Sequence, residues 1–217
     1  MTTSIIIPAR YGSSRYRGKP LVKILGKEMV IRVADICNKI KNVNVFIATD
    51  SKKIANVVKK YGYKYIFTSS KCLTGTDRVA EASKKIKSKI FINVQGDEPT
   101  INPVDIKKVI YAKKKFPNHV ICGYDKVHDF ENPSSINLPK VVVNSKGELI
   151  YISRALVPGK KKISQKIQYH KQVCIYAFNK NELKKFNSRN QKGKLEKIED
   201  IEILRFFEDD IKIKMVK

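Results

Sequence analysis

The sequence lacks the two glycine-rich loops that most often bind phosphate. The dinucleotide fingerprint needs three glycines in the spacing G-x-G-x-x-G, and the first loop of this chain contains only Gly12 and Gly18. The Walker loop ends in Gly-Lys-Ser or Gly-Lys-Thr, whereas here Lys19 is followed by Pro20. An anion bound by this loop would therefore be held by side-chain charge more than by a tight nest of glycine amides.

Long hydrophobic runs are also absent. No apolar run approaches the roughly 18 residues of a membrane span, and the N-terminus shows no charged and then apolar secretory signal. The four cysteines lie far apart and form no C-x-x-C pair, which argues against a zinc site and a redox motif. Scattered free thiols fit a reducing compartment, so we expect a cytoplasmic protein without a membrane partner.

Acidic residues are few. Asp and Glu together number 20 against 45 for Lys and Arg, and the formal net charge is +25. This balance invites a nucleic-acid interpretation, but most cations are lysines in helical patterns, where solvated faces are expected, and no nucleic-acid-binding motif is present. We expect no specific nucleic-acid partner. Arginine, a forked donor suited to phosphate and carboxylate, is scarce, and three of its eight positions lie in the first loop.

The most informative segment is a short apolar run that leads into this basic loop. Residues 4–9 have a strand pattern, and residues 10–19 contain four cations, two glycines and two serines. A buried first strand that ends in such a loop can present cations and amides to an anion above a sheet, and a triphosphate is the natural guest. The alternative is an ordinary solvated turn.

The first half of the chain alternates strand-length apolar runs with helical patterns. Strands are expected at 4–8, 43–49, 65–68 and 90–94, and helices at 29–40, 52–60, 77–86 and 103–116. This alternation predicts a doubly wound α/β fold with a mostly parallel sheet covered on both faces. Ligands of such sheets bind beyond the carboxyl ends of the strands, which would gather the loops 9–19, 69–77 and 95–99 in one place.

After residue 120 short strands predominate. We expect strands at 120–127, 140–143, 148–153, 172–178 and 211–216, a loop at 158–170, and helices at 181–186 and 195–207. No repeat or low-complexity linker divides the sequence. Residues 1–217 are therefore predicted to form a single α/β domain with a small mixed β subdomain.

Polar residues follow the predicted strands, and each has a functional and a structural interpretation. Asp97, directly after the strand 90–94, could hold Mg²⁺ against phosphate oxygens or could only cap the next turn. The loop before the helix at 77–86 could contact a base or ribose, or Thr76 or Asp77 could be its N-cap. Asp50 has the same ambiguity, and an N-cap role alone explains it well.

Candidates in the second half are weaker. Arg154 stands near the end of a predicted strand, where a lone arginine usually forms a surface ion pair. Glu196, Glu199 and Glu202 recur every three residues in a helical pattern, and most such stripes are solvated.

Taken together and in this order, these segments resemble the 3-deoxy-manno-octulosonate cytidylyltransferases. The resemblance extends from residue 5 to about residue 216, and its most specific stretch is Asn-Val-Gln-Gly-Asp-Glu-Pro at 93–99. The other matching segments are 7–11, 18–21, 48–50, 74–78, 139–142, 151–155, 175–176, 195–196 and 204–205.

The resemblance implies a nucleotide-diphospho-sugar transferase-like fold and a Mg²⁺-dependent transfer of CMP from CTP to the anomeric hydroxyl of 3-deoxy-manno-octulosonate (Kdo). Pyrophosphate would leave, and the product would serve lipopolysaccharide synthesis. Transfer to phosphorus needs positioning and charge neutralisation, and in-line attack through two metals is the expected geometry. A homodimer is also implied, with residues of about 120–180 carrying sugar-site and dimerisation elements.

The resemblance also implies site residues. Arg10, Lys19 and Asp97 would be catalytic, with Asp97 as the Mg²⁺ ligand. Substrate-binding residues would be Ser13, Ser14 and Arg15 at the triphosphate, Thr74, Gly75, Thr76 and Arg78 at the cytidine, and Gln95, Arg154, Tyr176 and Glu202 around the sugar.

The chain departs from the family pattern at three places. Tyr16 and Arg17 stand where the family usually has Leu-Pro, and Gln172 stands where it has a histidine. Family members continue past the last strand with a segment that carries a second metal ligand, so we expect this chain to fold and bind CTP but to turn over poorly.

Other functions remain open from the sequence. The acceptor could be an amino-substituted Kdo or a nine-carbon sugar acid. The chain could also be an inactive family member, or a non-catalytic basic module that binds phosphate or nucleic acid.

Overall fold

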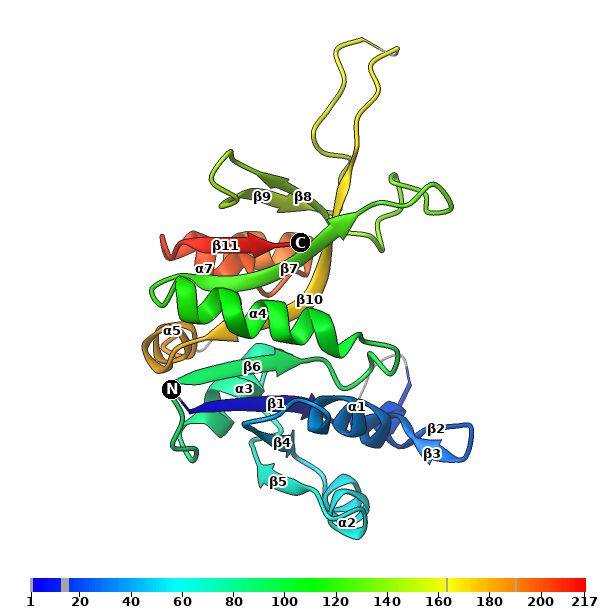
Figure 1. The fold of residues 1–217 in the computed structure, drawn as a ribbon, viewed down its shortest axis with the longest axis vertical. Coiled ribbons are helices and arrows are strands. Elements are labelled where there is room, and N and C mark those ends of the chain that lie inside the picture. Colours follow the sequence, from blue (N-terminus) through cyan, green and yellow to red (C-terminus); the bar gives the residue numbers. More distant parts are fainter. Residues whose placement is uncertain (1, 13–15, 163, 190) are drawn as a thin grey trace.

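A nine-stranded mixed sheet forms the centre of the molecule (Figure 1). The computed structural model describes residues 2–12, 16–162, 164–189 and 191–217. The main path of the sheet is β11-β7-β10-β6-β1-β4-β5. Its strands are β1 (Thr3–Ala9), β4 (Val43–Thr49), β5 (Lys64–Phe67), β6 (Ile90–Val94), β7 (Val120–Lys126), β10 (His170–Phe178) and β11 (Ile213–Val216).

The prediction of a mostly parallel sheet is confirmed. Strands β6, β1, β4 and β5 run parallel, and β11 runs parallel to β7. Strand β10 lies between β6 and β7 and is antiparallel to both. Two further strands, β8 (Lys140–Val143) and β9 (Leu149–Ser153), pair with each other, and β8 also pairs with β10. A small separate hairpin consists of β2 (Lys23–Ile24) and β3 (Lys27–Glu28).

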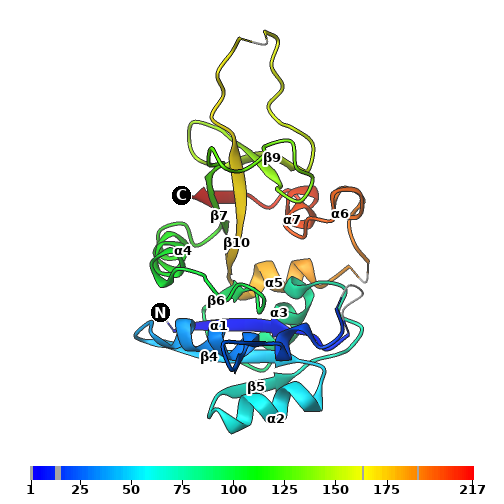
Figure 2. The same cartoon turned by 90° about the vertical axis from the view of Figure 1, so that its right-hand side faces the viewer.

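Helices cover both faces of the sheet, as Figure 2 shows. One face packs against α1 (Met29–Asn38), α2 (Lys52–Lys60) and α4 (Pro103–Lys115). The other packs against α3 (Gly75–Ser83), α5 (Lys180–Phe186) and α7 (Leu204–Glu208). Two short elements complete the fold, the 3-10 helix η1 (Lys19–Leu21) and the helix α6 (Lys194–Glu199).

The apolar run of β1 explains this two-sided packing. Successive side chains of a strand point to opposite faces of the sheet. Ile5 and Ile7 accordingly join the core under α1, α2 and α4, while Ile6 joins the core under α3, α5 and α7. All three side chains are fully buried. A continuous apolar strand is therefore what a sheet with helices on both faces requires.

Three local predictions were wrong. The helix expected at 195–207 is broken into α6 and α7, because Asp200 adopts a left-handed conformation with φ of 49°. The N-cap of α3 is Thr74 and not Thr76 or Asp77. The N-cap of α2 is Ser51 and not Asp50, since the Ser51 hydroxyl accepts the hydrogen bond from the Ile54 amide.

The segment before β10 projects away from the sheet at the top of Figure 1. Its described residues between 154 and 169 form neither helix nor strand, in line with the loop expected there. No helix of the described residues has the length and apolar character needed to cross a membrane.

Candidate active site

A polar cavity of about 450 Å³ lies beyond the carboxyl ends of β1 and β6. All three loops that the sequence predicted to meet there contribute to its wall, which confirms that prediction. The lining residues that the sequence had singled out are Arg10, Lys19, Thr74, Gly75, Arg78, Gln95, Asp97 and Glu202.

The loops after β1 and β6 approach each other closely at the floor of the cavity. A Cβ atom on Gly96 would lie 2.8 Å from the carbonyl oxygen of Pro8, which is closer than real Cβ contacts allow. Only glycine fits at this position. A Cβ atom on Gly75 would lie 3.2 Å from Gln95 Oε1, so the third loop is packed against the other two as well.

Lys19 and Asp97 form an ion pair across the cavity. Lys19 Nζ lies 2.6 Å from Asp97 Oδ2, and the two side chains are 42% and 47% exposed. Gly18, in a left-handed conformation with φ of 77°, donates its N–H to the Tyr11 carbonyl at 2.8 Å and turns the basic loop back toward the sheet. Asp97 is thus paired with a cation of the first loop, which a simple turn cap would not require. Arg10 is exposed in the same wall.

The acidic residues of this edge could hold a cation. Asp97 is a half-exposed carboxylate, and partial burial raises the pKa of the adjacent Glu98 carboxyl, with Asp97 raising it further. Within the described ranges, no group of three or more His, Cys, Asp and Glu side chains could bind a metal by itself. Mg²⁺ commonly takes one or two protein carboxylates and completes its shell with phosphate oxygens and water, so Asp97 fits this ion.

Arg78 is buried in α3 and links this helix to the first loop through Asp50. Its guanidinium donates to Thr68 Oγ1 at 2.5 Å and to Asp50 Oδ2 at 3.0 Å. The other carboxylate oxygen of Asp50 accepts the N–H of Tyr11 at 3.2 Å. Asp50 is therefore a bridge between the basic loop and α3.

Glu202, in the turn between α6 and α7, lines the cavity and binds the first turn of α3. Its carboxylate accepts hydrogen bonds from the backbone N–H groups of Gly75 and Thr76, at 3.0 and 2.9 Å, and from Thr76 Oγ1 at 2.5 Å. Burial raises the pKa of the Glu202 carboxyl, although these hydrogen bonds act in the opposite direction. A carboxylate is well placed at a helix N-terminus, where unpaired N–H groups and the helix dipole favour negative charge.

The acidic stripe at 196, 199 and 202 is therefore not solvated. Glu196 is fully buried, and Glu199 accepts hydrogen bonds from Ser153 Oγ at 2.6 Å and the Arg154 N–H at 2.8 Å. The expectation of a solvated stripe was wrong because α6 and the following turn pack between β9 and α3 instead of facing water.

Two residues that the resemblance placed around the sugar lie outside the cavity lining. The Arg154 guanidinium donates to the backbone carbonyls of Glu199, Asp200 and Ile136, at 2.5, 3.2 and 2.7 Å. Tyr176 is buried in β10, and its hydroxyl accepts a hydrogen bond from Gln172 Nε2 at 3.0 Å. Ser13, Ser14 and Arg15, expected at the triphosphate, lie outside the described residues.

The cavity also contains residues that the sequence did not indicate. Lys192 and Asp200 line its wall and form an ion pair with a distance of 2.7 Å between Nζ and Oδ1. Cys72, Leu73 and Tyr16 line it too, and they belong to the loops that were predicted to meet there without being named as site residues. No local motif marks Lys192, which precedes α6, or Asp200, which lies in the turn between α6 and α7 where the helical pattern is broken.

The mostly parallel sheet, together with a cation-bearing cavity beyond its strand ends, defines an α/β protein that binds its ligand at the carboxyl ends of its strands. Sequence comparison is more specific. The pattern of the cytidylyltransferase family matches residues 4–213, and the chain belongs to that family.

Individual relatives agree with this assignment. The chain is 35% identical to 3-deoxy-manno-octulosonate cytidylyltransferase of Escherichia coli, over 97% of this chain and 85% of the relative. It is 33% identical to 8-amino-3,8-dideoxy-manno-octulosonate cytidylyltransferase of Shewanella amazonensis, over 99% and 89%. The solved structure of a CMP:2-keto-3-deoxy-manno-octonic acid synthetase complexed with CTP matches with a TM-score of 0.92 and 33% identity, over 100% of this chain and 89% of that one.

Proposed function

We propose that this chain transfers CMP from CTP to the anomeric hydroxyl of Kdo and releases pyrophosphate. The observation that carries the proposal is the Lys19–Asp97 ion pair, which joins a basic loop and an acidic strand end across one cavity. The resemblance to Kdo cytidylyltransferases over nearly the whole chain supports the choice of CTP and Kdo.

The cations of the first loop would neutralise the triphosphate. Arg10 and Lys19 both face the cavity from the loop after β1. When the triphosphate arrives, Lys19 can leave Asp97 for a phosphate oxygen, since a half-exposed ion pair contributes little stability and can exchange partners. The Asp97 carboxylate is then released. It would hold Mg²⁺, which supplies charge neutralisation at the phosphate oxygens when bound.

The wall opposite would hold the nucleoside. Thr74 and Gly75 line the cavity at the start of α3, and the buried Arg78 fixes their loop against Asp50. Gln95, beside them at the end of β6, is the lining residue that the resemblance assigns to the sugar. This arrangement would place the acceptor hydroxyl near the α-phosphate, and positioning of that kind is a major part of catalysis at phosphorus.

The direct test is pyrophosphate release from CTP and Kdo with Mg²⁺, compared with the same reaction with ATP, GTP or UTP. We expect release with CTP and Kdo that requires both substrates and stops when the metal is chelated. A protein that binds CTP but releases no pyrophosphate would contradict the enzymatic proposal. A preference for another nucleotide would contradict the choice of CTP.

The acceptor has one close competitor, because a relative of similar identity is named for the 8-amino sugar. A panel of Kdo, 8-amino-Kdo and a nine-carbon sugar acid at saturating CTP distinguishes them. We expect the highest kcat/KM with Kdo, and a higher value with the 8-amino sugar would reassign the acceptor.

We further propose that the protein is a homodimer. Residues 120–180, which the resemblance implies in dimerisation, include large apolar side chains that are exposed: Phe130, Ile136, Ile150 and Leu156. Burial of such side chains against a second copy would be favourable. Sedimentation of the wild type against Phe130→Asp tests the proposal, and a monomeric wild type would refute it.

A further inference from the structure

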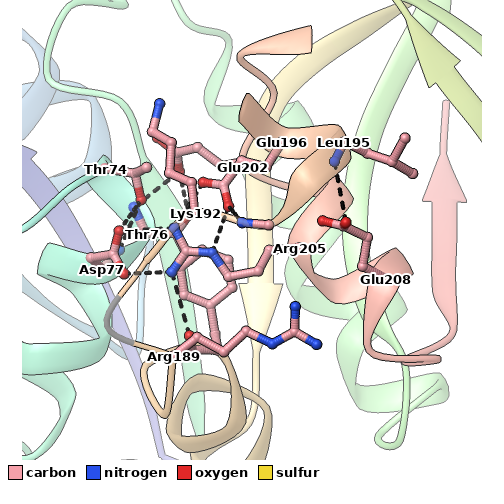
Figure 3. A network of polar contacts seen from close by, with 12 residues as sticks. Thr74, Thr76, Asp77, Arg189, Lys192, Leu195, Glu196, Glu202, Arg205 and Glu208 are labelled. Atoms are coloured by element: carbon pink, nitrogen blue, oxygen red, sulfur yellow. Dashed lines mark hydrogen bonds and ion pairs between the residues drawn. The ribbon is translucent and has the colours of Figure 1, made fainter. Parts of the chain in front are cut away.

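A buried ionic network joins the C-terminal helices to α3 (Figure 3). Arg205 in α7 has no exposed surface. Its Nε and Nη2 donate to the Glu196 carboxylate at 2.6 and 2.7 Å, and its Nη1 and Nη2 donate to the Asp77 carboxylate at 2.7 and 3.2 Å. The guanidinium carbon also lies 3.8 Å from the centre of the Phe186 ring. The plane of the guanidinium is thus fixed by two carboxylates and an aromatic face.

Asp77 connects this network to the cavity wall. Thr74 Oγ1 donates to Asp77 Oδ2 at 2.7 Å, and the Asp77 N–H donates back to Thr74 Oγ1 at 3.2 Å. Thr74 lines the cavity, whereas Asp77 and Arg205 do not. The carboxylate of Asp77 therefore binds Arg205 of α7 and Thr74 of the cavity wall at the same time, so that α7 helps to fix the position of the wall.

The same C-terminal segment holds the first turn of α3 at a second point. Glu202, three residues before Arg205, accepts the backbone N–H groups of Gly75 and Thr76. There is little room for this turn to move toward the sheet. A Cβ atom on Gly75 would lie only 3.2 Å from Gln95 Oε1 and 3.3 Å from Pro8 Cγ, and all three residues line the cavity.

Stability alone does not explain such a network. A buried ion pair often adds no more stability than apolar side chains of similar volume would, because both partners lose their hydration. Its distinctive property is geometry, since the forked guanidinium accepts only a narrow range of carboxylate positions. We propose that Arg205 is a positioning residue of the nucleotide site, which holds the first turn of α3 so that Thr74 and Gly75 present the nucleoside-binding wall at the right spacing. This inference rests on the proposed binding of CTP in the cavity.

Arg205→Lys tests the inference, because lysine keeps the buried charge but cannot bridge two carboxylates with a planar fork. We expect CTP to bind about tenfold more weakly to this variant, equivalent to about 1.4 kcal/mol. The KM for CTP should rise by a similar factor, while kcat at saturating CTP stays within about threefold, because a misplaced binding wall weakens ground state and transition state alike. Calorimetric titration and steady-state rates should be measured well below the Tm of every variant.

Lys113→Met is the matched control. Lys113 is a buried cation as well, with Nζ 2.7 Å from Glu182, but it joins α4 to α5 and lies outside the cavity lining. This control should lose at least as much Tm as Arg205→Lys and still bind CTP within about twofold of the wild type. If Arg205→Lys also lowers the Tm and leaves CTP affinity unchanged, Arg205 is only structural and the inference is wrong.

Asp77→Asn decides the matter if Arg205→Lys does not fold. This variant keeps an oxygen for Arg205 but loses an acceptor, and Asp77 itself lies outside the cavity lining. Weaker CTP binding by Asp77→Asn supports the inference, and unchanged binding overturns it. A wild-type protein that does not bind CTP at all would instead refute the proposed function, so the two failures are distinguishable.

Discussion

The cavity and the C-terminal helices use charge in opposite ways. In the cavity, the Lys19 and Asp97 side chains form an ion pair while 42% and 47% exposed. Under the C-terminal helices, the Arg205 and Glu196 side chains form one at 0% and 1% exposure. A half-exposed pair exchanges partners at little cost, whereas breaking a buried pair leaves a charge without solvent. The first arrangement suits a site that must accept a charged ligand, and the second suits a scaffold that must not move.

Glu182→Gln should have the largest effect on stability. Glutamine can keep the capping interactions at the start of α5, but it removes the counter-charge of the buried Lys113. Loss of one partner of a buried pair costs about 3–5 kcal/mol. Denaturant unfolding should show this loss, while kcat and KM below the Tm stay close to wild type. A large loss of activity in the folded variant would mean that the scaffold and the site are not separate.

Asp97→Asn should have the reverse effect. The side chain is half exposed, so the Tm should change little. Loss of the carboxylate would weaken the binding of Mg²⁺, and loss of one electrostatic contribution of this kind to the transition state costs about 10²–10³ in rate. Pyrophosphate release at saturating CTP, Kdo and Mg²⁺ measures it. Asp105→Asn is the control, because its carboxylate is similarly exposed at 46% and lies outside the cavity. If the Asp97→Asn variant stays active and only melts at a lower temperature, Asp97 is a turn cap and not a metal ligand.

Lys19→Ala should weaken CTP binding by about 10- to 100-fold, because a hydrogen bond to a charged group contributes about 1.5–3 kcal/mol. Arg10→Ala should act in the same direction, since Arg10 faces the cavity from the same loop. Binding of the sugar should change less for both variants. Separate titrations with each substrate check this, and equal losses for CTP and sugar would argue against a triphosphate site at the first loop.

Lys27→Ala should have the smallest effect. It tests whether partial exposure alone distinguishes an ion pair of the ligand site from an ordinary surface pair. Lys27 and Asp35 lie 2.6 Å apart with side chains 39% and 35% exposed, much like Lys19 and Asp97, but both residues lie outside the cavity lining. Exposed pairs contribute about 0–1 kcal/mol. We expect a Tm close to wild type and unchanged CTP affinity. A marked effect on CTP binding would show that exposure alone does not separate ligand-binding pairs from surface pairs.

The strands and helices of the first half were predictable because their signals are local. The apolar runs at 43–49 and 90–94 are strands with the expected bounds, and the helical pattern at 52–60 is α2. Convergence of the three loops followed from a general property of parallel sheets. Asp97 was identified because it lies in the loop directly after a strand, and Lys19 because it belongs to the basic loop that the resemblance assigns to the triphosphate.

Predictions in the second half failed where long-range contacts compete with a local pattern. The period of 195–207 favours one helix, but Asp200 turns the chain so that Glu199 can bind the end of β9 and Glu202 can bind α3. The guanidinium of Arg154 holds backbone carbonyls of that turn and does not form the surface ion pair expected of a lone arginine, while its assignment to the sugar stays a prediction. Neither outcome follows from spacing along the sequence.

The order of the elements, the two-sided core and the edge of the sheet that carries the cavity were determined by the sequence itself, because periodicity and apolar runs act over a few residues. Tertiary structure alone decided which charges meet. Arg205 and Asp77 are separated by 128 residues, Glu202 and Gly75 by 127, and Lys113 and Glu182 by 69. The local sequence around a lysine or glutamate does not show whether its side chain is solvated or buried. Its partner, its desolvation and therefore its role depend on which distant segment packs against it.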